Sequence, residues 1–211
     1  HLCDRRQRQM CIRDRLIIVC VLLMTIGCFA RDNNSKLNVK HTAFAAMAMA
    51  LAVATSMIKV IKLPMGGSVT LFSMLFIVLI GYWYGIKVGL TAALAYGVLQ
   101  LLLDPYILNI PQVLLDYILG FGALGLSGIF SNSRHGLIKG YIVGVIGRFI
   151  CSFLSGWIFF AVYTPEFFNS AILYSVVYNG SYIGLEAVVT LVVISLLPVN
   201  KALAYVKNNL V

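Results

Sequence analysis

The chain has 211 residues, of which 61% are hydrophobic and only 11% are charged. Soluble domains carry about 25% charged residues, so this composition excludes a soluble protein and leaves room for six or seven membrane spans of about 20 residues each. The net charge of +9 does not indicate nucleic-acid binding, because the basic residues lie in short loops and at the ends of the chain rather than in a patch with exposed aromatic residues.

Residues 1–35 differ from the rest of the chain. The segment from Arg5 to Arg15 has neither helical nor strand periodicity. Leu16–Ala30 is apolar, but its length is closer to that of a signal-peptide core than to that of a full span. We expect residues 1–35 to be a dispensable leader or an artefactual N-terminus, with a genuine extra helix as the alternative, and residues 36–211 to form the membrane domain.

Six apolar runs follow, and each is expected to form a transmembrane helix. They cover roughly residues 41–62, 70–84, 87–104, 111–130, 138–162 and 170–198. The breaks between them combine turn-forming residues with charged ones, as at Asp104-Pro105, which is typical of helix ends at a membrane interface. The sequence therefore predicts an all-α integral membrane protein built as a bundle of six transmembrane helices.

The basic residues favour one orientation of this bundle. If the first helix starts in the cytoplasm, the inner segments contain Lys36, Lys40, Lys87, Arg134, Lys139, Lys201 and Lys207. The outer loops contain Asp104 and Glu166, with Lys59 and Lys62 as exceptions. Lysine and arginine are enriched in cytoplasmic loops, so both termini of the six-helix domain are expected to be cytoplasmic.

The first run contains small residues at a spacing of four, namely Ala46, Ala50 and Ala54, with Ala48 and Ala52 between them. A strip of small side chains lets another helix approach closely. That helix belongs either to a partner protein or to this bundle, and the spacing leaves both possibilities open.

Three of the predicted helices carry polar residues at similar depths. At a rise of about 1.5 Å per residue, these residues lie about 6–15 Å below the outer ends of their helices. They are Asp116 and Tyr117 of the fourth run, Ser152 and Gly156 of the fifth, and Tyr174 and Asn179 of the sixth. A carboxylate at membrane depth costs roughly 2.5–3.5 kcal/mol and is a functional candidate. We expect a polar pocket here; the alternative is that these groups only bond to one another and hold the helices together.

Two further charged residues, Arg148 and Glu186, lie at membrane depth in the fifth and sixth runs. By helix rise they are up to about 10 Å apart in depth, which a long arginine on a tilted helix can span. The sequence allows either an ion pair between them or a position for Arg148 at the border of the pocket.

No pattern in the chain predicts an enzyme. The histidines, His1, His41 and His135, lie at helix ends or in loops, and there is no HExxH, GxSxG or Walker A sequence. No CxxC pair or Cys/His cluster predicts a metal or redox site. We therefore expect a protein without a cofactor that does not hydrolyse ATP itself.

Several short motifs occur in a fixed order along residues 36–198. They are Pro64 to Ser68, Gly85 to Gly89, Asp104 to Tyr117, Gly147 to Phe149, Ser155-Gly156, Phe159-Phe160, Tyr163 to Glu166, Tyr174-Ser175, Tyr178 to Tyr182, and Glu186. Together they resemble the bacterial thiamine transporter family, the thiamine-specific S components of energy-coupling factor (ECF) transporters.

The resemblance implies a six-helix protein of the bacterial plasma membrane that binds thiamine near the outer face. ATP-driven uptake would then depend on a separate module of one ECF transmembrane coupling subunit and two ATPase subunits. Thiamine is the transported ligand and not a cofactor. The family docks its coupling partner on a small-residue strip of the first helix, which assigns Ala46, Ala50 and Ala54 to partner docking.

The resemblance also implies roles for individual residues. Asp116 matches an acidic ligand contact with Tyr117 beside it, and Tyr174 and Asn179 match polar contacts of the sixth helix. The remaining members of the implied site are Arg148, Ser152, Gly156, which lets a ring lie close, and Phe160, which falls where an aromatic residue stacks on the ligand.

The chain departs from the family pattern in three places. A serine, Ser152, stands where the family usually has histidine, and Asp116 is shorter than the usual glutamate by one methylene. The turn Tyr82 to Gly85 lacks the expected arginines. Two alternatives therefore stay open: an S component for a different vitamin, and a structural membrane protein without a transport function.

Overall fold

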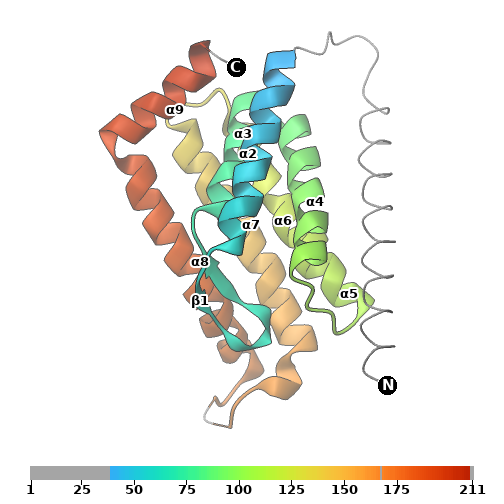
Figure 1. Ribbon diagram of the computed structural model, residues 1–211. Helices are drawn as coiled ribbons and strands as arrows, with labels where there is room; N and C mark the ends of the chain where they lie inside the picture. The colour runs from blue at the N-terminus through green and yellow to red at the C-terminus, as the bar shows by residue number, and fades with distance from the viewer. Residues whose placement is uncertain (1–38, 167, 210–211) are drawn as a thin grey trace.

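The computed structural model describes residues 39–166 and 168–209, and shows a bundle of apolar helices with a small β-hairpin at one end (Figure 1). The predicted leader, residues 1–35, and the first residues of the predicted membrane domain lie outside the described part of the chain.

Six helical segments correspond to the six predicted apolar runs. They are α2 (Val39–Met57), α3 (Ser73–Tyr84), α4 (Ile86–Leu103), a composite helix over residues 110–130, α7 (Gly136–Phe159) and α8 (Ala171–Ser195). Among the described residues, four of these segments are long and apolar enough to cross a membrane, namely α4, the composite helix, α7 and α8. The predicted all-α membrane fold is confirmed.

The composite helix changes its winding along its length. It begins as α5 (Ile110–Val113), continues through the π-helical turn η2 (Leu114–Leu119) and α6 (Gly120–Gly122), and ends as the 3-10 helix η3 (Ala123–Phe130). The side chain of Asn109 caps its start by accepting a hydrogen bond from the backbone N–H of Gln112 at 2.8 Å. Single π-helical turns occur frequently at functional sites.

The first loop is a β-hairpin and not part of a helix. The prediction that the first apolar helix extends to residue 62 was wrong, because α2 ends at Met57 and β1 (Lys59–Lys62) pairs antiparallel with β2 (Ser68–Thr70). The β-branched residues of β1 suit a strand, and the connecting 3-10 turn η1 (Pro64–Gly66) bends through positive φ angles at Met65 and Gly66. The hairpin lies next to α8 at one end of the bundle (Figure 1).

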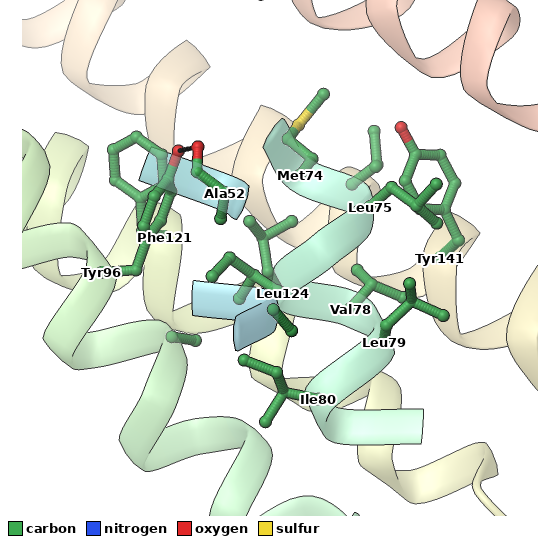
Figure 2. Close-up of a cluster of buried hydrophobic side chains, with 14 of the residues drawn as sticks. Ala52, Met74, Leu75, Val78, Leu79, Ile80, Tyr96, Phe121, Leu124 and Tyr141 are labelled. Atoms are coloured by element: carbon green, nitrogen blue, oxygen red, sulfur yellow. Dashed lines mark hydrogen bonds between the residues drawn. The ribbon is translucent and has the colours of Figure 1, made fainter. Parts of the chain in front are cut away.

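Helix α3 forms the centre of the bundle. Its 12 residues span about 18 Å, less than the roughly 30 Å of a hydrocarbon layer, and eight of them are buried. Figure 2 shows Met74, Val78 and Ile80 of α3 in the core that also contains Leu124 of η3. The helix is short because the hairpin directly precedes it, with β2 ending at Thr70 and α3 starting at Ser73.

Glycine allows the backbones around α3 to approach closely. A Cβ atom on Gly89 of α4 would lie 2.6 Å from the Cα of Gly81, and one on Gly125 of η3 would lie 2.6 Å from the Cα of Leu90. Such distances are too short for any side chain, so α3, α4 and η3 pack through backbone contacts of the kind common between membrane helices.

A separate helix, α9 (Leu197–Asn209), lies at the end of the bundle opposite the hairpin (Figure 1). The predicted sixth run, 170–198, did not include it. Pro198 falls in the first turn of α9, where its missing N–H costs no helical hydrogen bond. The Lys207 ammonium donates to the carbonyl oxygen of Ser131 and lies 4.0 Å from the ring centroid of Tyr82.

Candidate ligand-binding site

A cavity of about 130 Å³ lies between the hairpin, α4, the composite helix, α7 and α8. One water molecule requires about 10–15 Å³ on this scale, so the cavity has room for a small organic molecule. All eight residues predicted to form the ligand site line it: Asp116, Tyr117, Arg148, Ser152, Gly156, Phe160, Tyr174 and Asn179. The fold thus brings together residues that lie up to 63 positions apart in the sequence (179 − 116 = 63).

The carboxylate of Asp116 is held by two neighbours inside the cavity. Its Oδ2 atom accepts a hydrogen bond from Gln112 Nε2 at 2.7 Å and another from Ser155 Oγ at 2.7 Å. Among the described residues, no hydrogen bond involves Oδ1. The carboxylate therefore has one oxygen fixed by the protein and one oxygen available to a ligand.

The third loop, residues 104–109 between α4 and the composite helix, is attached to the helix that carries Asp116. The hydroxyl of Tyr117 accepts a hydrogen bond from the Tyr106 N–H and donates one to the Asp104 carbonyl oxygen, both at 2.9 Å. The Tyr106 ring in turn stacks on Phe160, the residue directly after α7, with centroids 5.8 Å apart and an interplanar angle of 23°. Aromatic rings from two different segments therefore line one side of the cavity.

Helices α7 and α8 meet at Gly156. A Cβ atom there would lie 2.9 Å from Asn179 Nδ2 and would also collide with the Ser175 hydroxyl, so a larger residue would force both side chains to shift. Asn179 is held within α8, because its Nδ2 donates to the Ser175 carbonyl at 3.0 Å and its Oδ1 accepts from the Tyr182 hydroxyl at 3.0 Å. These partners of Asn179 all belong to α8, so its bonds do not link it to the polar groups of the other two helices, and Asn179 lines the cavity.

The hairpin turn covers the tyrosines of α8. Tyr178 donates from its hydroxyl to the Pro64 carbonyl and accepts from the Gly67 N–H at 3.0 Å. The Tyr174 hydroxyl lies 3.6 Å from the sulfur of Met65. The turn from residue 64 to residue 67 is therefore fixed to α8 at the cavity.

An ion pair joins the other side of the hairpin to the third loop. Lys59 of β1 and Asp104 at the end of α4 form it, and both residues line the cavity. Asp104 also accepts the hydrogen bond from Tyr117 through its backbone carbonyl. The first and third loops are thus connected to each other beside the site.

Arg148 and Glu186, considered as a possible ion pair, have different surroundings in the structure. The Arg148 guanidinium lies over the Phe121 ring, 3.9 Å from its centroid, and lines the cavity. Glu186 instead accepts from Thr70 Oγ1 at 2.7 Å and from the Met74 N–H at 3.3 Å, at the start of α3. A carboxylate is stabilised at a helix N-terminus by the unpaired N–H groups there. Of the two possibilities, the structure shows Arg148 at the border of the cavity.

Sequence reasoning missed several residues of the cavity wall. They are the hairpin residues Met65 to Ser68, together with Ser56, Lys59, Tyr106, Gln112, Ser155 and Tyr178. Tyr106 and Gln112 belong to the motif in the third loop and fourth run, so that motif could have indicated them. The hairpin residues Met65 to Ser68 belong to the motif Pro64 to Ser68 in the same way, but that motif does not show that they lie beside α8, which arises from tertiary folding.

The alanine strip of α2 divides into two faces. Ala46, Ala50 and Ala54 are exposed, whereas Ala48 and Ala52 are buried against the bundle. The predicted internal packing therefore applies to the second pair, and the first three form a smooth surface on the outside of the described bundle. Within the described residues no group of three His, Cys, Asp or Glu side chains is placed to hold a metal ion.

Comparisons with known proteins agree on one family. The family model described as Thiamine transporter protein (Thia_YuaJ) matches residues 42–206. The thiamine transporter ThiT of Bacillus subtilis (strain 168) is 30% identical over 151 residues, which cover 65% of this chain and 78% of that protein. ThiT of Lacticaseibacillus paracasei is 28% identical over 123 residues, covering 50% and 61%.

A solved structure supports the same similarity. It is described as native-SAD phasing for ThiT from Listeria monocytogenes, and it superposes with a TM-score of 0.62 at 27% sequence identity. The alignment covers 78% of this chain and 94% of that one.

Proposed function

This chain belongs to the thiamine transporter protein family, and on that premise we propose that it is the substrate-binding subunit of an ECF-type importer that captures thiamine in the cavity beside Asp116. The family is one of transporters and not of enzymes, and the apolar helices make the chain a multi-pass membrane protein. The resemblance seen in the sequence is confirmed by these comparisons.

The charges inside the bundle support a cationic ligand. Beyond the first turn of each helix, the described spans carry two carboxylates, Asp116 and Glu186, and one guanidinium, Arg148. This leaves one negative charge more than positive charges. Thiamine carries a permanent positive charge on its thiazolium ring, and a bound cation next to Asp116 would offset part of the cost of burying the carboxylate.

The aromatic residues of the cavity support a flat ligand with two rings. Tyr106, Phe160, Tyr174 and Tyr178 line the cavity near its hairpin side. The face of an aromatic ring attracts a cation by about 0.5–2 kcal/mol. The free oxygen of Asp116 could accept from the exocyclic amine of the aminopyrimidine ring, a bond strengthened by the charge of the acceptor. Asp116 with this aromatic wall is the observation that carries the proposal.

The distribution of surface charge supports capture from outside the cell. Exposed Lys87, Arg134, Lys139 and Lys201 belong to the segments at the α9 end of the bundle, whereas the acidic residues Asp104 and Glu166 belong to loops at the cavity end. Basic residues favour the cytoplasmic side. We therefore place the cavity at the outer face of the plasma membrane and both termini of the six-helix domain in the cytoplasm.

Coupling to ATP would require other subunits, since the sequence contains no Walker A motif. The exposed strip of Ala46, Ala50 and Ala54 offers a surface on which a helix of a coupling subunit can lie closely. We propose this strip as the docking site of the ECF transmembrane subunit, which in turn carries two ATPase subunits.

Reconstitution tests this function directly. The full chain is inserted into liposomes with a coupling subunit and two ATPase subunits, and uptake of radiolabelled thiamine is measured with and without ATP. We expect uptake only with ATP and with the complete complex. Uptake by the chain alone, or a chain that binds thiamine but forms no complex, would contradict the proposed coupling.

A further inference from the structure

Gln112 occupies a central position between the third loop and the acid of the cavity. Its side chain is 1% exposed and lines the cavity. It lies one helical turn before Asp116 on the same helix, so that both side chains share one face. No role was assigned to it from the sequence, although it belongs to the motif from Asp104 to Tyr117.

Every polar atom of the Gln112 side chain has a partner. Nε2 donates to Asp116 Oδ2 at 2.7 Å and to the Tyr106 carbonyl at 3.2 Å, while Oε1 accepts from the Leu108 N–H at 3.2 Å. These partners fix the orientation of the amide. A flipped amide would place its oxygen against a carboxylate and a carbonyl, and its donors against an N–H group.

Two of the bonds that hold the third loop to its helix come from Gln112. Ile107 and Leu108 are exposed by 59% and 38%, so the loop gains little from burying its side chains. Both backbone polar groups of Tyr106 are bonded: its N–H donates to the Tyr117 hydroxyl, and its carbonyl accepts from Gln112 Nε2. The position of Tyr106 beside Phe160 is therefore fixed by Gln112 and Tyr117, two residues of the helix that carries Asp116.

We propose that Gln112 is a positioning residue, which orients the Asp116 carboxylate toward the ligand and fixes the third loop, with Tyr106, over the same ligand. Its Nε2 group donates to Oδ2 of Asp116, so that Oδ1 is left to bind the ligand. Its acceptor end holds the loop through Leu108. The identity of the ligand rests on the function proposed above, whereas the link between the acid and the loop does not.

Two substitutions separate the two ends of the amide. Gln112→Met keeps the length of the side chain and removes both donor and acceptor. Gln112→Glu keeps the acceptor for Leu108 but loses the donor and adds a second negative charge beside Asp116. Ser155→Ala serves as the matched control, since Ser155 is the other donor to Asp116 Oδ2 and has no bond to the loop.

Hydrogen exchange of the Leu108 amide, measured without ligand, reports on the loop. We expect exchange to become at least about 10-fold faster in Gln112→Met, because the amide loses a net hydrogen bond of about the usual strength. It should stay within about 2-fold of the parent in Ser155→Ala, and should rise less in Gln112→Glu than in Gln112→Met, because Gln112→Glu keeps the acceptor for Leu108 and loses only the donor to the Tyr106 carbonyl. Equal exchange in Gln112→Met and the parent would overturn the role assigned to the acceptor end.

Thiamine titration of the purified variants reports on the acid. A donor to a charged group contributes enough that Gln112→Met and Gln112→Glu should each weaken binding by roughly 10- to 100-fold. Because Gln112 acts in part through Asp116, Gln112→Met in an Asp116→Asn background should weaken binding by a smaller factor than in the parent, and only the part that acts through the loop should remain. Fully additive losses, or unchanged affinity in both Gln112 variants, would overturn the positioning role.

The two measurements also separate this inference from the proposed function. A parent protein that fails to bind thiamine would contradict the proposed ligand. The exchange of the Leu108 amide would still test the connection between Gln112 and the loop.

Discussion

The substitution Asp116→Asn removes one negative charge from the cavity while keeping the size of the side chain. Oδ2 of Asp116 accepts from Gln112 and from Ser155, each at 2.7 Å. The amide oxygen of asparagine can take the same position and accept both bonds. Its NH₂ group must then take the place of Oδ1, so that donors face the ligand where an acceptor stood.

The loss of affinity follows from this exchange. A charge-assisted hydrogen bond contributes about 1.5–3 kcal/mol, which corresponds to roughly a 10- to 150-fold change in affinity. We therefore expect the dissociation constant for thiamine to rise by that factor in Asp116→Asn. Isothermal titration of the detergent-purified full chain measures it directly.

Glu186→Gln provides a matched control, because it removes the other carboxylate of the described spans at a site that does not line the cavity. Glu186 bonds the start of α3 through Thr70 and Met74. Its loss should lower the thermal stability of the protein and leave thiamine affinity within about 3-fold of the parent. If Asp116→Asn binds thiamine as tightly as the parent, or if Glu186→Gln loses the same affinity, Asp116 is not the ligand contact.

Three further outcomes are expected. Ser152→His should strengthen thiamine binding, measured by titration, because the imidazole adds a ring face to the cavity; weaker binding would show that the buried site has no room for it. Ala50→Trp should abolish thiamine uptake in cells and leave binding to the purified protein intact, whereas Val188→Trp, at an exposed position of α8, should leave both unchanged; normal uptake by the Ala50 variant would exclude the strip from docking. Deletion of residues 1–32 should leave membrane insertion and thiamine binding unchanged, and loss of either in the shortened protein would assign the leader to the fold.

The sequence predicts the helices well because membrane spans carry a strong local signal. The run 111–130 corresponds to a helix over residues 110–130, and the run 70–84 to α3, which starts at Ser73. The depth of polar residues along these helices was sufficient to predict that Asp116, Ser152 and Asn179 line one cavity, as they do in the structure. Lipid tails offer no hydrogen-bond partners to such groups, so polar side chains at membrane depth are expected to point into the bundle.

Other features depend on contacts that no local pattern contains. The strand β1 continues directly from an apolar helix, and only its pairing with β2 distinguishes it from a further helical turn. Glu186 accepts from the start of α3 and not from Arg148, because the short α3 leaves its first N–H groups inside the bundle. The bonds of Gln112 likewise require the third loop to fold back on its own helix.

Binding of vitamins by the isolated protein tests the central claim most directly. The full chain is purified without a coupling module and titrated in parallel with thiamine, riboflavin, biotin and pyridoxine. A cavity that combines Asp116 with stacked aromatic rings should bind thiamine tightly and the other three weakly or not at all. Tight binding of a different vitamin would show that the changes at Ser152 and Asp116 alter the ligand, and binding of none of the four would contradict the assignment of this cavity to vitamin capture.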